Sequence, residues 1–353
     1  MDQRRDNRNN SRRDGRARAA AKHIAAMEER FGKEIAASVA GVRLYDGMPK
    51  LAKVKADKIA AEGAAATAAF EELLADAGTV ASEAAADVDV AAQPAVEQPE
   101  APSAPAVTVV AQDATAAVLE NGRGRALFCD TALLDFASFT SPGGGYERGA
   151  WAQEEALCAD SFLYNVLATQ KDFYGANRRR NINCNLYRNR GLVAPKVRFE
   201  RDKVHAYADV IVVAAPNARR AREEYGVSRA QLEQAMHDRI RFVLAIADDL
   251  GHDKLILGAF GCGVFGWDAE QVAEMLRAEL ATGGHVATQV IIAVPQTRFD
   301  ENLAKFEHVF SAFPDAPAES YAAAAANRAE AAAEQAAADA EDEDDNEDWR
   351  KYL

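Results

Sequence analysis

Residues 254–280 read KLILGAFGCGVFGWDAEQVAEMLRAEL, and this stretch gives the clearest indication of the fold. Its first part, 254–260, is a short apolar run typical of a strand buried on both faces. Three glycines follow within six residues, and Asp268 then stands where an N-cap would start a helix that continues to Leu280. A buried strand, a glycine-rich turn and a helix in this order predict one unit of an α/β fold.

The same pattern recurs along the chain. Further strands are predicted at 107–110, within 126–139, at 209–217 and at 289–295. Helices are predicted at 113–120, 154–170, 228–250 and 299–310, with Ser228 as an N-cap and Gly251 as a stop signal. Strands that alternate with helices predict a sandwich with helices on both sides of a mostly parallel sheet.

The flanking segments differ in composition from this main part. We expect a disordered basic arm at 1–18, a helical accessory region at 19–85, an Ala/Pro/acid-rich linker at 86–106, the main domain at 107–312 and an acidic low-complexity tail at 313–353. Within the accessory region, helices are predicted at 17–41 and 50–77, with a short extended piece between them. The tail is expected to be a frayed helix or disordered.

Composition excludes several classes of protein. Of the 353 residues, 41 are Lys or Arg and 55 are Asp or Glu, so the net charge of −14 disfavours non-specific duplex DNA binding. We therefore expect no specific nucleic-acid partner. No apolar run reaches the roughly 20 residues of a membrane helix, and no signal peptide is visible, so we expect a cytoplasmic protein with no membrane partner. The four cysteines, at 129, 158, 184 and 262, are scattered and the six histidines lack ligand-like spacing, so no metal site, disulfide framework or cofactor is expected.

Two glycine-rich loops follow predicted strands, at 135–145 (DFASFTSPGGG) and 257–268 (LGAFGCGVFGWD). Ligands of open α/β sheets bind beyond the carboxyl ends of strands, where glycines let backbone N–H groups approach an anion. Two such loops predict a ligand with a phosphate or pyrophosphate. Residues 261–266 also match GxGxxG, so a Rossmann oxidoreductase is an alternative, although that fingerprint normally opens its domain.

Gln153, Glu154 and Glu155 begin a predicted helix seven residues after three consecutive glycines. A carboxylate near an anionic ligand is repelled by it, which raises its pKa and suits it to general acid catalysis. Adjacent helical residues project about 100° apart, so the two carboxyls are expected to have different roles.

The spacing GGG, seven residues, QEE resembles the signature of bacterial-type poly(ADP-ribose) glycohydrolases, which have a macrodomain fold. The segments 21–34, 133–157, 197–203, 209–217 and 255–273 resemble successive blocks of that family, so the likeness spans roughly residues 20–80 and 107–312. It implies a three-layer sandwich around a mixed, mostly parallel sheet, preceded by N-terminal accessory helices. It also implies that Glu155 is the catalytic acid and base, that Glu154 holds ribose hydroxyls and that Gln153 fixes the catalytic loop.

The resemblance further implies the substrate-binding positions. Gly143, Gly144 and Gly145 would line the loop around the scissile ribose, Gly261, Cys262, Gly263 and Val264 would form the diphosphate loop, and Phe265 would pack against the terminal ribose. The chain departs from the family at Asp135 and Ser141, where Asn is usual; Asp135 would still bond a ribose hydroxyl.

The reaction implied is metal-free hydrolysis of the ribose–ribose bond through an oxocarbenium-like state, releasing ADP-ribose. The expected partner is poly(ADP-ribose) or an ADP-ribosylated protein, and the chain is expected to be a monomer. The alternatives are a non-catalytic ADP-ribose-binding macrodomain and a hydrolase of mono-ADP-ribosyl or other ADP-ribose-derived substrates.

Overall fold

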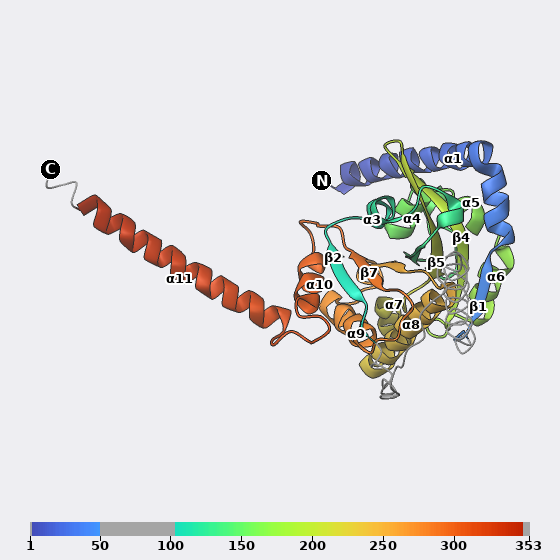
Figure 1. The fold of residues 1–353 in the computed structure, drawn as a ribbon. Coiled ribbons are helices and arrows are strands. Elements are labelled where there is room, and N and C mark those ends of the chain that lie inside the picture. The colour runs from blue at the N-terminus through green and yellow to red at the C-terminus, as the bar shows by residue number, and fades with distance from the viewer. Residues whose placement is uncertain (1, 50–102, 349–353) are drawn as a thin grey trace, which may run out of the picture.

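The structure, a computed structural model of the chain, describes residues 2–49 and 103–348, and its centre is a seven-stranded sheet (Figure 1). The strand order is β1-β4-β5-β3-β6-β7-β2. The strands from β5 to β2 pair in parallel, while β4 pairs antiparallel with both β1 and β5. The bounds are β1 Arg43–Asp46, β2 Ala106–Val110, β3 Thr131–Phe136, β4 Arg190–Arg201, β5 Val204–Val213, β6 Lys254–Leu257 and β7 Gln289–Ala293. A mixed, mostly parallel sheet is thus confirmed.

Helices cover both faces of the sheet and make it the middle of three layers (Figure 1). Successive strand residues point to opposite faces, so on β3 Leu133 packs into one apolar cluster and Leu134 into the other. One face is covered by α1 Asp2–Ala40, α3 Ala114–Asn121, α4 Gln153–Ala159, α5 Leu163–Leu167 and α6 Lys171–Arg180. The other is covered by α7 Ala218–Tyr225, α8 Arg229–Leu250, α9 Ala269–Ala281 and α10 Asn302–Phe310.

The expected helix signals are present in the structure. Ser228 caps α8 through a capping box with Gln231, and Gly251 ends that helix in the left-handed conformation at φ +75°. Asp268 accepts a hydrogen bond from the backbone N–H of Gln271 and so starts α9. Asp113 caps α3 in the same way. Local sequence therefore decides where these helices begin and end.

The single helix predicted over 154–170 is wrong, because the structure divides it into α4 and α5. Ser161 lies between them: its hydroxyl donates to the carbonyl of Leu157 at 2.6 Å and accepts from the N–H of Leu163 at 3.0 Å. Asp160 beside it pairs with Arg201 at 2.6 Å. These side-chain bonds replace helical backbone bonds and turn the chain.

Strand β4 was not predicted. Its sequence, RGLVAPKVRFER, contains Pro195, which has no N–H for a sheet ladder, and its register with β5 shifts between Ala194 and Val197. The irregular alternation that accompanies this bulge hides the strand from a test of periodicity.

The N-terminal expectations also need correction. Residues 2–18, expected to be disordered, form the first part of α1, which lies along the domain and is stabilised by its contacts there. β1, from the expected accessory region, is an edge strand of the main sheet, and Ala106, expected in the linker, opens β2. The helix predicted at 50–77 and most of the linker lie outside the described residues.

The tail contains the helix α11, Tyr321–Asp348. Of the two forms expected for the tail, a frayed helix or disorder, the structure therefore shows a helix. Across residues 2–49 and 103–348, none of the helices combines the length and the apolarity that crossing a membrane requires.

Candidate active site

The two glycine-rich loops lie side by side, because β3 and β6 are neighbours in the sheet and end at the same edge. Phe136 and Phe260, at the start of the two loops, have ring centroids 5.6 Å apart. Tyr187, from the segment before β4, stacks on Phe139 of the first loop at 4.4 Å and lies 6.3 Å from Phe265 of the second. Sequence reasoning missed Tyr187, since nothing in its local pattern marks it as a contact between two distant loops.

Gln153 joins the first turn of α4 to the end of β3. Its side-chain oxygen accepts from the N–H of Phe136, and its amide nitrogen donates to the carbonyl of Leu134, both at 2.9 Å. The side chain thus replaces a strand partner at this position, and it sets the direction in which the next two residues project.

Glu154 and Glu155 both accept backbone N–H groups of the loop that precedes them. Glu154 Oε2 accepts from Ser138 at 2.6 Å, and Glu155 Oε1 accepts from Gly145 at 2.8 Å. The two carboxyls therefore face different parts of the loop, as their offset on the helix predicts. Each has a second oxygen that these bonds leave unused.

Gly144 lies directly against both carboxyls, which explains why glycine is needed there. Its φ is +62°, and a Cβ at this position would lie 2.5 Å from Glu155 Oε1 and 2.9 Å from Glu154 Oε2. Gly143 has φ +59°, and a Cβ at this position would lie 2.6 Å from the ring of Tyr164. Glycine adopts this backbone without the strain that a Cβ brings, and it also lets the loop close on the glutamates.

Asp135 lies beneath the two glutamates and is completely buried. Neither of its carboxyl oxygens has a hydrogen-bond partner among the described residues. Burial, and then the charge of Glu155, raise the pKa of Asp135 well above its usual range. This shift favours the neutral form of the side chain, since an unpaired buried carboxylate is costly. The contact with a ribose hydroxyl that the resemblance implies for Asp135 stays a prediction.

Glu154 shares this environment and is 3% exposed. Burial, and then Asp135, raise its pKa, although the N–H of Ser138 acts in the opposite direction. The thiol of Cys158 and the hydroxyl of Tyr174 are buried beside it, and burial followed by the charge of Glu154 raises the pKa of both. Several ionisable groups thus share one dry volume under the loop.

The second loop presents its backbone to solvent. Gly261 turns the chain at φ +81°, and a Cβ there would lie 2.9 Å from the Trp267 side chain. A Cβ at Gly263, by contrast, would have no atom of the described residues within 4 Å. Val264 is 70% exposed. Burial raises the pKa of the Cys262 thiol, which suits a small packing residue better than a nucleophile.

Helix α1 contacts the segment between the first glycine-rich loop and α4, which the sequence did not reveal. Arg13 Nε donates to the carbonyl of Arg148 and Arg16 Nε to that of Gly149, both at 2.8 Å. Gly149 has φ +69°, and a Cβ there would lie 2.0 Å from the carbonyl oxygen of Arg13. The helix therefore touches the loop backbone directly.

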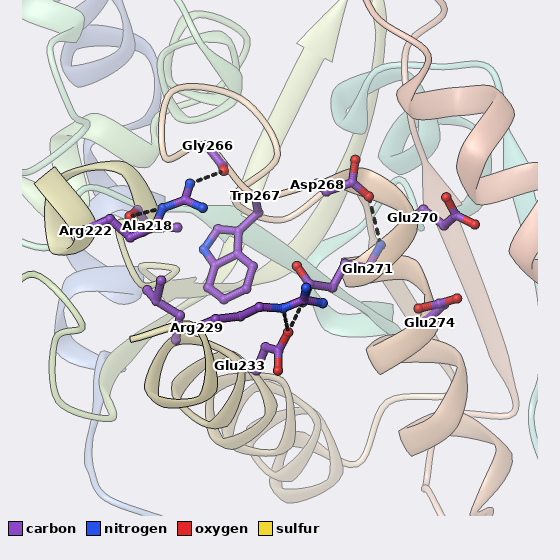
Figure 2. A pocket seen from close by; sticks show the side chains of 11 residues that line it. Ala218, Arg222, Arg229, Glu233, Gly266, Trp267, Asp268, Glu270, Gln271 and Glu274 are labelled. Carbon is purple, nitrogen blue, oxygen red and sulfur yellow. Dashed lines mark hydrogen bonds and ion pairs between the residues drawn. The ribbon is translucent and has the colours of Figure 1, made fainter. Parts of the chain in front are cut away.

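A cavity of about 470 Å³ lies on the other face of the sheet, between α7, α8 and α9 (Figure 2). None of the site residues expected from the sequence lines it. Its charged side chains are largely engaged: Arg229 pairs with Glu233 at 2.6 Å, and Arg222 donates to the carbonyls of Ala218 and Gly266. The cavity is distinct from the glutamate site.

The comparisons with known proteins agree with this geometry. A family model described as microbial-type PARG (poly(ADP-ribose) glycohydrolase), catalytic domain, matches residues 20–202. A solved poly(ADP-ribose) glycohydrolase from Thermomonospora curvata, bound to the inhibitor ADP-HPD, is 26% identical with a TM-score of 0.59, covering 84% of this chain and 99% of that one. A second structure of the Thermomonospora curvata enzyme is 29% identical, with the same TM-score, over 83% and 98%.

The enzyme from Deinococcus radiodurans in complex with ADP-ribose is 29% identical with a TM-score of 0.52, over 58% of this chain and 84% of that one. Among curated proteins, no relative matches the chain.

Proposed function

The chain belongs to the microbial-type poly(ADP-ribose) glycohydrolase family, and from this membership we propose the reaction that its site performs. The substrate is poly(ADP-ribose), and the bond hydrolysed is the ribose–ribose O-glycosidic bond, so that ADP-ribose is released. The observation that carries this proposal is the pair of buried carboxyls, Glu154 and Glu155, held by N–H groups of the glycine-rich loop.

Glu155 is the acid and base of this proposal. Its Oε1 accepts the N–H of Gly145, so the carboxyl has one fixed orientation and its other oxygen is left for the substrate. The protonated carboxyl gives its proton to the leaving ribose oxygen as the glycosidic bond breaks. The resulting carboxylate then takes a proton from water, whose oxygen adds to the oxocarbenium-like carbon.

Glu154 and Gln153 position the substrate and the loop. Burial raises the pKa of Glu154 and so favours its protonated form, in which the side chain is able to donate a hydrogen bond to a ribose hydroxyl. Gln153 holds α4 on the end of β3. Keeping Asp135 neutral removes the repulsion that a charge would exert on a nearby diphosphate.

The remaining binding groups come from the two loops. Gly143 and Gly144 bring the backbone to the scissile ribose, while 261–264 approach the diphosphate through their exposed backbone, and Phe265 packs on the terminal ribose. We also propose that the chain acts as a monomer in the cytoplasm, which agrees with four free cysteines.

The decisive experiment is chromatography of the products formed from ADP-ribose polymers of defined length. We expect the protein to release ADP-ribose and Glu155→Gln to lose at least about 1,000-fold in turnover, because a proton-transfer group is removed. Glu155→Gln should still bind ADP-ribose in calorimetry. Glu307→Gln, on the exposed face of α10, is the matched control and should keep full activity.

Full turnover by Glu155→Gln would refute the assignment of the catalytic residue. Tight ADP-ribose binding by the unaltered protein with no hydrolysis of polymer would instead identify a binding macrodomain. Release of ADP-ribose from singly modified proteins but not from polymers would identify a mono-ADP-ribosyl hydrolase.

A further inference from the structure

A second cluster of reactive side chains lies at the opposite edge of the sheet from the glutamates. Cys129 precedes β3 and His252 precedes β6, while Asp209 lies in the middle of β5, level with the start of β3. These three strands are parallel neighbours, with Ala132 opposite Asp209 and Thr131 opposite Lys254. Since parallel strands bring their amino ends together, the fold joins three residues that are far apart in the sequence.

The three side chains converge on one point. His252 Nε2 lies 3.0 Å from Asp209 Oδ2, and Cys129 Sγ lies 3.7 Å from Asp209 Oδ1. One ligand atom from each residue fits within a mutual separation of 4.8 Å. In tetrahedral zinc sites, the usual bond lengths place nitrogen and oxygen ligands about 3.3 Å apart, and sulfur and oxygen ligands about 3.5 Å apart. Small side-chain adjustments would therefore produce a zinc coordination geometry.

The surroundings also resemble a prepared metal site. Asp209 is 8% exposed, and its Oδ1 accepts the N–H of Lys196 at 2.7 Å, which fixes the carboxylate while Oδ2 faces His252. Backbone bonds of this kind orient metal-binding carboxylates in known sites.

We propose that Cys129, Asp209 and His252 bind one zinc ion, with solvent completing the coordination. Thiolate, imidazole and carboxylate together favour zinc over magnesium or calcium, which prefer sites made of oxygen alone. The ion would link the amino ends of β3 and β6 to the middle of β5. The sequence predicted no metal site because no cysteines or histidines have the short spacing of a metal-binding motif. Here Cys129 and Asp209 are 80 residues apart in the sequence, and Asp209 and His252 are 43 residues apart.

Cobalt and zinc titrations of the tag-free, chelator-treated full chain test this proposal. We expect one equivalent of Co²⁺ to produce a thiolate-to-cobalt charge-transfer band, which Zn²⁺ abolishes by displacement. Cys129→Ser should remove the band, and His252→Asn should weaken zinc binding at least about 100-fold in calorimetry. Cys184→Ser, which removes an exposed thiol, is the control and should keep the band. Zinc should raise the melting temperature of the unaltered protein and of Cys184→Ser, but not that of Cys129→Ser.

The absence of a charge-transfer band in the unaltered protein would overturn the proposal, whatever the variants do. A band that survives in Cys129→Ser would also overturn it, because the thiolate would then come from another cysteine. Release of ADP-ribose is measured in parallel and should not depend on zinc, since the ligands and the glutamates lie at opposite ends of β3, so this readout separates the metal site from the catalytic proposal.

Discussion

Replacing Gly144 by alanine tests whether the loop backbone sets the position of the Glu155 carboxyl, the proposed acid and base. Gly144 has φ +62°, a conformation that costs a residue with a Cβ about 1–2 kcal/mol. The new Cβ would also lie 2.5 Å from Glu155 Oε1, whereas ordinary contact begins at 3.4 Å. The carboxyl must therefore give way by 3.4 − 2.5, or about 0.9 Å.

A displacement of about 1 Å in a reacting group costs about 100-fold in rate, or about 2.7 kcal/mol of barrier. We expect Gly144→Ala to lower kcat by about this factor in the polymer assay. Gly226→Ala is the matched control, because Gly226 also has φ +62° but has nothing within 4 Å of its Cβ position. The control should lose similar stability in thermal unfolding and keep its turnover.

Two results would refute this reasoning. A kcat for Gly144→Ala within twofold of the unaltered protein would show that the carboxyl does not depend on close contact with this glycine. An equal loss of turnover in Gly226→Ala would show that backbone strain and reduced stability, not displacement of Glu155, explain the effect.

Three further predictions concern residues around the loop. Arg16→Ala should lower kcat about tenfold, because it removes a charged donor to the loop backbone, whereas Arg18→Ala, exposed on the same helix, should not. Tyr187→Ala should raise KM about tenfold by separating the two glycine-rich loops, and Tyr187→Phe, which keeps the ring, should not. Asp135→Asn should raise the melting temperature at pH 7 to 9, and the gain should vanish near pH 4; a gain that is independent of pH would contradict a raised pKa.

The pH dependence of Asp135→Asn follows from the direction of its pKa shift. The pKa of Asp135 in the folded protein is raised above its ordinary value, chiefly by burial, so over a range of pH the folded state holds a proton that the unfolded state releases. The contribution of Asp135 to the free energy of unfolding is therefore most favourable below about pH 4. It falls by about 1.4 kcal/mol per pH unit as the pH rises from the pKa of the unfolded state towards the pKa of the folded state. Because asparagine does not titrate, the stability of the Asp135→Asn variant does not fall in this way as the pH rises.

Several structural features were predictable from short stretches of sequence. The caps at Asp113, Ser228 and Asp268 depend on hydrogen bonds within three or four residues, and each is present. The break at Ser161 is equally local, but it was missed because the apolar spacing of 154–170 continues through it. Strand β4 was missed because its bulge interrupts the alternation on which the prediction relied.

The sequence by itself determined the α/β class, the two glycine-rich loops at strand ends and the glutamate pair, because each depends on contacts between residues near one another in the chain. Only the tertiary structure decided that Asp135 is buried with no hydrogen-bond partner among residues 2–49 and 103–348, that Tyr187 joins the loops and that α1 contacts Gly149. The tertiary structure also brings together Cys129, Asp209 and His252, which are far apart in the sequence. Burial and long-range contact depend on how strands are ordered in the sheet, and that order is set by the packing of the whole chain rather than by any one segment.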